Sequence, residues 1–246
     1  MPLTASPEDQ ALLLDLQSID TKLQQLAHKA DSLPELAALV RLTTEAEEVR
    51  LQLGADSGAL DDARTELKRV ESDVELVETR IKRDTDRLDA TSSVKDVVGL
   101  EAELTSLRKR RSDLEDIELT VMERIEEFEA TAAATTARRD ELGAQVASVE
   151  SDRDAALATL NGERTNATEN RATIVGTLPA ELFALYERQR ERYGTGASML
   201  QGGVSSASGV KLNESDMAAI RAAAPDDVVL CPDSNAILVR TSESGL

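Results

Sequence analysis

The side chains best suited to catalysis or metal binding are scarce in this 246-residue sequence. It contains one histidine and one cysteine, Cys231, and a single cysteine by itself makes neither a disulfide within the chain nor a metal site. Ser205 and Ser208 lie in a glycine-rich stretch without a neighbouring base. Acidic pairs such as Glu126-Glu127 indicate acid–base catalysis only inside a pocket. No glycine loop for phosphates is present, so the sequence predicts no enzyme, no catalytic residue and no cofactor.

Basic residues are concentrated in one part of an acidic chain. The 28 Lys and Arg are outnumbered by 47 Asp and Glu, which gives a formal net charge of -19. The cations between residues 80 and 111 are Arg80, Lys82, Arg83, Arg87, Lys95, Arg108, Lys109, Arg110 and Arg111. They could form a docking patch for phosphate or for an acidic partner helix. Alternatively, they could pair across helices at flanking heptad positions with four acidic residues: Glu75, Glu78, Glu101 and Glu103.

The net charge and the apolar pattern also exclude some partners and compartments. Nonspecific binding of nucleic acid relies on Lys and Arg that neutralise phosphates, and an anionic membrane surface likewise attracts cations. No apolar run approaches the ~20 residues that span a bilayer. The first residues lack the basic and apolar regions of a signal peptide. We therefore expect a cytoplasmic protein without a membrane partner.

Leucine, alanine, valine and isoleucine supply most of the apolar surface. Aromatic residues make up 2% of the chain and Trp is absent, which is typical of a coiled-coil seam and not of a globular core. A helix is expected to begin at Ser6-Pro7. Apolar residues then recur at spacings of four and three, the heptad pattern: Leu12, Leu16, Ile19, Leu23 and Leu26. Pro34 predicts a kink near residues 31–35, and residues 54–58 contain two glycines that predict a second weak point.

Two longer heptad stretches follow, at residues 60–88 and 100–160. Only Asp84 breaks the register of the first one. The segment between them, residues 89–95, is mostly small and polar, so it predicts a turn. About 85 residues lie on each side of Ser92. Two matched helical arms therefore predict a long antiparallel coiled-coil hairpin over residues 1–177.

Folding about Ser92 brings the two seams together, with Leu67 expected near Ile117. A parallel homodimer of one unbroken helix would not need the turn and would leave the matched arm lengths unexplained. Assembly of two chains nevertheless stays open, so the sequence allows a monomer or a homodimer.

Residues 178–246 predict a small α+β module. One helix is expected over residues 180–193, and a short one, capped by Asn213 or Ser215, is expected to run through Met217 to Ala223. Residues 194–209, rich in Gly, Ser and Ala, predict a loop. Residues 228–230 and 236–240 indicate two short strands with a turn between them. The fold class is therefore mainly α, a helical hairpin with a small C-terminal module.

The order of these segments resembles the bacterial coiled-coil hairpin proteins that carry a C-terminal C4-type zinc ribbon. The resemblance covers essentially the whole chain. It rests on the hairpin followed by Leu178-Pro179-Ala180-Glu181-Leu182, on Tyr186-Glu187-Arg188, on the glycine-rich stretch and final Ile237-Leu238-Val239-Arg240, and on Leu107 to Asp116. It implies a zinc-ribbon-like module in which two Cys-x-x-Cys pairs hold the metal.

The four ligand positions implied by this resemblance are degenerate in the present chain. They are occupied by Ser205, Ser208, Cys231 and Ser234. Structural zinc takes four ligands, usually thiolates or imidazoles, and a serine hydroxyl is too weakly acidic to replace them. We therefore predict that no metal is bound and that the module is held by packing. Its expected core is Phe183, Tyr186, Ile220, Val229, Ile237 and Val239.

The resemblance implies a non-enzymatic scaffold or adaptor whose hairpin binds a protein partner. Members of the resembled family include a chaperone-like partner of the sigma factor sigma-54, which suggests a role in transcription or secretion-related regulation. The alternative is nucleic-acid binding, because zinc ribbons often contact RNA or DNA. Since residues 178–246 carry more acids than bases, such binding would depend on the cations from Arg80 to Arg111.

Overall fold

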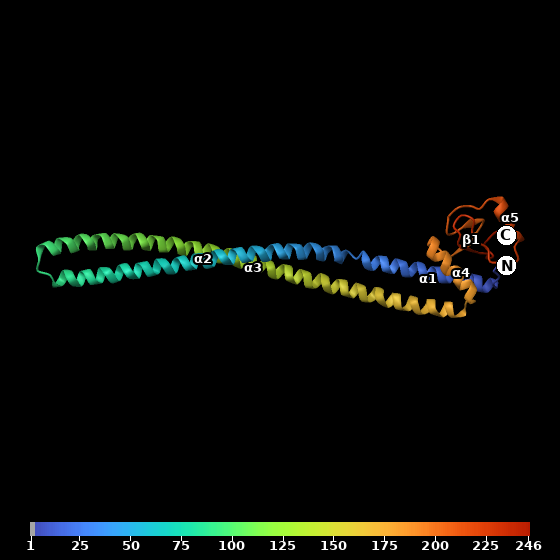
Figure 1. Ribbon diagram of the computed structural model, residues 1–246, viewed down its shortest axis with the longest axis horizontal. Coiled ribbons are helices and arrows are strands. Elements are labelled where there is room, and N and C mark those ends of the chain that lie inside the picture. The colour runs from blue at the N-terminus through green and yellow to red at the C-terminus, as the bar shows by residue number, and fades with distance from the viewer. Residues whose placement is uncertain (1–2) are drawn as a thin grey trace. The chain divides into compact units, whose positions relative to one another are not determined.

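The computed structural model describes residues 3–246 and shows a mainly helical chain (Figure 1). The helices are α1 (Pro7–Asp31), α2 (Pro34–Ala90), α3 (Val94–Thr177), α4 (Ala180–Tyr193) and α5 (Glu214–Ala222). The strands are β1 (Ala197–Gln201), β2 (Val204–Ser205) and β3 (Ile237–Val239). None of the helices in this described range is long and apolar enough to cross a membrane. Two compact units are present, one of residues 35–151 and one of residues 1–34 with 152–246.

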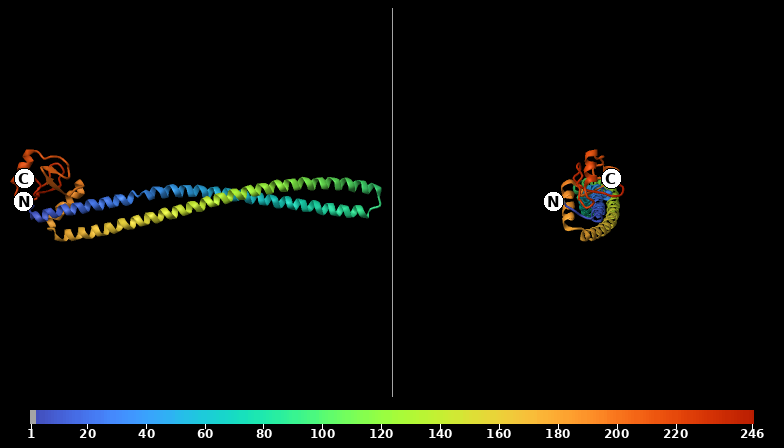
Figure 2. Two further views of the ribbon diagram at one scale, coloured as in Figure 1. Left: turned by 180° about the vertical axis from the view of Figure 1, so that it is seen from behind. Right: turned by 90° about the vertical axis from the view of Figure 1, so that its right-hand side faces the viewer.

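The unit of residues 35–151 is an antiparallel pair formed by α2 and the first part of α3, which wind about each other (Figures 1 and 2). Residues 91–93 form the turn between them, where the Val97 N–H donates to the Ser93 carbonyl at 3.0 Å. The buried seam consists of Leu42, Ala63, Val70, Asp84, Leu100, Leu104, Leu114, Val121 and Leu142. The predicted fold class, a mainly α chain with a long helical hairpin, is thus confirmed.

Two details of the predicted hairpin are wrong. Gly54 and Gly58 do not interrupt α2, which is unbroken from Pro34 to Ala90. A glycine inside a helix costs only about 1 kcal/mol relative to alanine, so packing along the seam is sufficient to keep the helix intact. Ile117 is 43% exposed and lies outside the seam, whereas Leu114 and Val121 are buried, so the register differs from the expected pairing.

Asp84 is the one charged residue inside this seam. Its side chain is fully buried, and one carboxylate oxygen has no hydrogen-bond partner among residues 3–246. The other oxygen lies 3.3 Å from Arg87 and 3.5 Å from Arg83, both of which are exposed. Burying a carboxylate is costly unless its pairing is complete. Asp84 therefore weakens the hairpin close to its turn.

Replacing Asp84 with leucine should stabilise this unit. A well-packed apolar residue in place of a buried charge is often neutral or stabilising by about 1–4 kcal/mol, and here it would restore the heptad seam. Thermal unfolding followed by circular dichroism at the helix band measures the effect. Asp86→Leu, at a neighbouring exposed position, is the matched control and should change little. A clear destabilisation by Asp84→Leu alone would show that the ion pairs outweigh the burial cost.

In the second unit, α1 begins and ends with local caps. The Ser6 hydroxyl accepts a hydrogen bond from the Asp9 N–H at 3.0 Å, with Pro7 in the first turn. At the other end, the N–H and hydroxyl of Ser32 both donate to the His28 carbonyl. Pro34 then opens α2. Side-chain capping thus ends α1, and the proline marks the beginning of α2.

The strands form a three-stranded sheet in the order β2-β1-β3, with β1 antiparallel to β2 and parallel to β3. This corrects the expected loop over residues 194–209, which contains β1 and β2. Residues 228–230 do not form the expected strand, because only Leu230 makes an isolated bridge, to Ile237. Glycine and serine dominate residues 194–209, so the composition predicted a loop although the segment contains the largely buried strand β1.

The short strand β3 is buried on both faces, so it separates two apolar clusters. Ile237 and Val239 pack in one cluster with residues of α1 and α4, including Leu13 and Tyr186. Leu238 packs in the other cluster, which consists of Leu200, Leu212, Met217, Ile220, Cys231 and Leu238. All three β3 side chains are fully buried. Helix α1, expected in the hairpin, thus completes the core of the C-terminal module.

Candidate functional site

The cations predicted as a docking patch lie in the unit of residues 35–151, at the end of α2 and the beginning of α3. Four of them form ion pairs: Arg80 with Glu103, Arg83 and Arg87 with Asp84, and Arg111 with Glu78 and Glu115. No carboxylate of residues 3–246 lies within 4.0 Å of the other five, which are Lys82, Lys95, Arg108, Lys109 and Arg110. Pairing across helices therefore accounts for Arg80 and Arg111 but leaves most of the patch unpaired.

The four residues predicted to occupy degenerate zinc-ligand positions, Ser205, Ser208, Cys231 and Ser234, lie in two equivalent turns. In the first turn, the Gly209 N–H donates to the Ser205 carbonyl at 2.8 Å; in the second, the Asn235 N–H donates to the Cys231 carbonyl at 2.9 Å. The fifth residue of each turn has a positive φ, 67° at Gly209 and 58° at Asn235, a conformation that glycine and asparagine tolerate best. The two segments thus share one backbone geometry although their sequences differ.

The Cys231 thiol is the centre on which these turns converge. Burial by itself would raise the pKa of the Cys231 thiol, but hydrogen bonds with the Ser205 and Ser234 hydroxyls and with the backbone at Asp233 and Ser234 lower that pKa below its usual value. Ser205 also lies 2.9 Å from the Ser198 hydroxyl. Ser208 instead accepts from the Val210 N–H at 3.2 Å. The Ser205 and Ser234 side chains therefore both lie close to the Cys231 thiol.

This cluster does not fit a zinc ion with its present side chains. It offers one thiol and hydroxyl groups, whereas structural zinc needs four strong ligands. Within the described range, no group of three or more His, Cys, Asp or Glu side chains is placed to hold a metal ion. The Ser205 hydroxyl lies 2.9 Å from the Ser198 hydroxyl, and Cys231 is fully buried among apolar neighbours.

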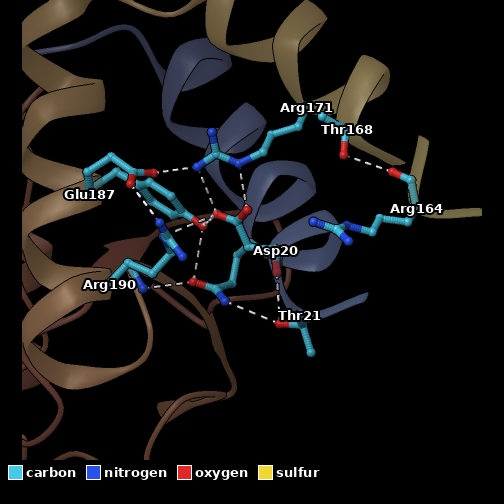
Figure 3. Close-up of polar contacts among 10 residues, drawn as sticks. Asp20, Thr21, Arg164, Thr168, Arg171, Glu187 and Arg190 are labelled. Carbon is cyan, nitrogen blue, oxygen red and sulfur yellow. Dashed lines mark hydrogen bonds and ion pairs between the residues drawn. The ribbon is translucent and has the colours of Figure 1, made fainter. Parts of the chain in front are cut away.

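A buried ionic network was missed by the sequence reasoning (Figure 3). Asp20 of α1 is 3% exposed and accepts from the Arg171 guanidinium at 2.6 Å and from the Tyr186 hydroxyl at 2.7 Å. Glu187 bridges Arg171 and Arg190, and Arg190 lies 3.4 Å from Asp20. The available signal was an acidic residue within the first heptad stretch, directly after Ile19.

The network joins α1, α3 and α4, and its electrostatics favour one protonation state. The hydrogen bond with Asp20 raises the pKa of Arg171 above its usual value. Burial, followed by the hydrogen bond to Asp20, raises the pKa of the Tyr186 hydroxyl well above its usual range. Close packing continues at Gly196, where an added Cβ would lie 2.5 Å from the Tyr186 ring. These groups are paired with one another, which indicates a structural clamp and not a reactive centre.

A groove of about 510 Å³ in the second unit follows α1 beside this network. Its lining includes Gln17, Thr21 and Gln25 of α1, the Lys22–Glu163 ion pair at 3.4 Å, and Ser206. The groove is open to solvent and its lining contains neither histidine nor cysteine.

Known proteins match this chain over most of its length. The chain is 35% identical to the uncharacterized protein Rv2229c of Mycobacterium tuberculosis, over 97% of this chain and 98% of that protein. A solved structure from Mycobacterium smegmatis matches with a TM-score of 0.86 at 36% identity, covering 97% of this chain and all of the other. CT398 from Chlamydia trachomatis shares the fold at 17% identity, with a TM-score of 0.66 over 95% of this chain and 98% of that one. Residues 16–194 match the model of the CT398-like coiled coil hairpin domain, and the chain belongs to that family.

Proposed function

We propose that this protein is a non-enzymatic scaffold or adaptor that binds a protein partner through its coiled-coil hairpin, in the cytoplasm. The observation that carries the proposal is the set of five unpaired cations in residues 80–111, Lys82, Lys95, Arg108, Lys109 and Arg110, in a chain of net charge -19. Exposed charges contribute little to stability even when they form ion pairs. These unpaired cations are therefore poorly explained as a feature that stabilises the fold. It suits electrostatic recognition of an acidic partner.

Nucleic-acid binding is the competing function for the same cations. Five unpaired cations are a small set beside the many phosphate contacts of a nucleic-acid binder, and the surrounding chain is acidic. Those cations are also not interleaved with aromatic side chains, which single-strand binding uses for base stacking. A protein partner, in transcription or secretion-related regulation as the sequence resemblance suggests, is therefore favoured.

We further propose that the module of residues 178–246 derives from a zinc ribbon and persists without metal. The two equivalent turns and the convergence of Ser205 and Ser234 on Cys231 support this origin. Packing of α1 against β3 and α4 supplies the core that a metal would otherwise help to hold together.

Affinity capture from a nuclease-treated extract of the native cell tests the main proposal. We expect the full chain to retain a defined set of proteins, and the variant with Arg108, Lys109 and Arg110 changed to alanine to lose them. Lys68→Ala with Arg69→Ala, at exposed positions of α2, is the control. Equal capture by all variants would contradict a role for this charge. Salt-sensitive gel shifts that the triple change abolishes would support nucleic-acid binding instead.

A further inference from the structure

A second heptad stripe runs along the solvent-exposed flank of α3, outside the seam that faces α2. Its members follow the alternating spacing of four and three that a third helix needs. They are Val94, Val98, Glu101, Thr105, Arg108, Ser112, Glu115, Leu119 and Met122. None of them belongs to the buried seam. We call this set the flank stripe; at ~1.5 Å per residue it is about 42 Å long.

The apolar side chains of the flank stripe are exposed to solvent. Val94 is 80% exposed, Val98 63%, Leu119 60% and Met122 44%. They account for most of the large apolar side chains that α3 exposes, the remaining one being Ile117. They form two pairs, one at each end of the stripe. Four such side chains at regular heptad spacing indicate a surface for a helix and not scattered apolar residues.

Ion pairs between the helices show which side of the hairpin the flank stripe borders. Arg111 reaches Glu78, and Arg64 reaches Glu129, on the side of the stripe. Arg80–Glu103 and Arg124–Glu66 join the helices on the other side. By the helical spacing of α2, Lys82 lies on the same side as Glu78. The stripe therefore borders one of the two grooves between the helices.

The positive charge of Arg108, at the middle of the flank stripe, argues against a second copy of this chain as the binding partner. Arg108 lies fourteen residues from Val94 and fourteen from Met122, and it has no carboxylate of residues 3–246 within 4.0 Å. Pairing of the stripe with its own copy, aligned end to end, would oppose Arg108 with Arg108. Glu101 and Glu115, seven residues to either side, would also face like charges. Such pairing is unfavourable, so a second copy fits this surface poorly.

We infer that the flank stripe binds an amphipathic partner helix with apolar residues at both ends and carboxylates at its centre, opposite Arg108. This inference rests on the proposed function and names the partner's chemistry. The apolar ends would contribute burial, and the central carboxylate would set the register, as a single polar residue does in coiled coils. The unpaired cations of residues 80–111 would attract such an acidic segment from solution.

Binding of designed peptides to the full chain tests the inference. The probe is a fluorescent helical peptide of about 28 residues, apolar at heptad positions near both ends and with glutamates at the centre. Matched probes carry glutamine or lysine at the centre, or serine in place of the apolar residues. We expect the glutamate peptide to bind, and Arg108→Glu to weaken it by about tenfold or more. The same substitution should strengthen binding of the lysine peptide by a similar factor.

Two substitutions on the opposite side of the hairpin are matched controls. Arg69→Glu makes the same charge change at an exposed position of α2 outside residues 80–111, and Leu76→Ser removes an apolar side chain that is 65% exposed. Both should leave the affinity within about threefold, whereas Val98→Ser with Leu119→Ser should weaken it about tenfold. Circular dichroism of each variant checks that the hairpin stays folded.

Several results would overturn the inference. One is equal weakening by Arg108→Glu and Arg69→Glu, which would mean that only the net charge of the chain attracts the peptide. The inference would also be contradicted if the glutamate peptide did not bind at 100-fold excess over the chain, or if a single-stranded oligonucleotide competed with it. A further contradicting result would be a dimer in sedimentation that the Val98 and Leu119 changes dissociate. If affinity capture from the native extract succeeds while the peptides fail, the scaffold function stands and the partner binds another surface.

Discussion

Asp20→Ala should destabilise the unit of residues 1–34 and 152–246 by about 3–5 kcal/mol, the usual cost of removing one partner from a buried ion pair. The substitution leaves Arg171 and the Tyr186 hydroxyl without the buried acceptor that they share. Because both tyrosines of the chain lie in this unit and Trp is absent, tyrosine fluorescence during urea unfolding reports its stability directly.

The controls separate the network from a general effect of charge. Asp15→Ala removes a carboxylate from an exposed position of the same helix and should change stability by less than about 0.5 kcal/mol. In a double-mutant cycle, Asp20→Ala with Arg171→Ala should cost clearly less than the sum of the two single changes, because each change already breaks the shared pair. Additive costs, or similar effects of Asp20→Ala and Asp15→Ala, would show that the network does not hold α1 to α4.

Installing three cysteines should convert the C-terminal module into a zinc protein. In the variant Ser205→Cys, Ser208→Cys and Ser234→Cys, the new thiols join Cys231 in two turns whose backbones already match. Four cysteine thiolates are a ligand set of structural zinc sites. We expect one zinc per chain under reducing conditions, measured by metal analysis after gel filtration. Since zinc binds the folded state, the unit should also gain several kcal/mol of stability.

Removing the original thiol provides the control for this prediction. Adding Cys231→Ser to the three changes leaves three thiolates and should weaken zinc binding strongly, while a chelator should reverse the stabilisation of the four-cysteine variant. If the four-cysteine chain remains fully reduced and folded yet binds no zinc, the proposed origin of these turns is wrong. A shift in stability without metal would instead indicate a change in packing at the buried cluster.

The two predictions concern the same compact unit but different means of holding it together. The Asp20 network ties α1, α3 and α4 through paired charges, and the strand β3 packs between two apolar clusters. If the module binds no metal, as we propose, its stability comes from such contacts. This explains why residues of α1, about 200 positions earlier in the chain, belong to its core.

Local chemistry made much of the helical architecture predictable. The heptad spacing identified the seam, because residues three and four apart share one face of a helix wherever the helix lies. Ser6, Pro7 and Pro34 act on their own backbone, so the ends of the helices follow from residue type. The charge cluster of residues 80–111 and the presence of a single cysteine are likewise properties of the sequence alone.

Contacts between distant residues decided the rest. Whether Arg111 meets Glu78 while Arg108 stays unpaired depends on the register of two helices, which a change of one heptad would alter without changing the pattern. Residues 197–205 form strands because β3 and the surrounding clusters bury them, although their composition indicates a loop. Asp20 becomes part of a clamp only when folding brings Arg171 and Tyr186 to it from more than 150 residues away. The sequence by itself determined the helices, their seam and the charge, since these depend on near neighbours; only the tertiary structure decided which charges are buried, paired or free.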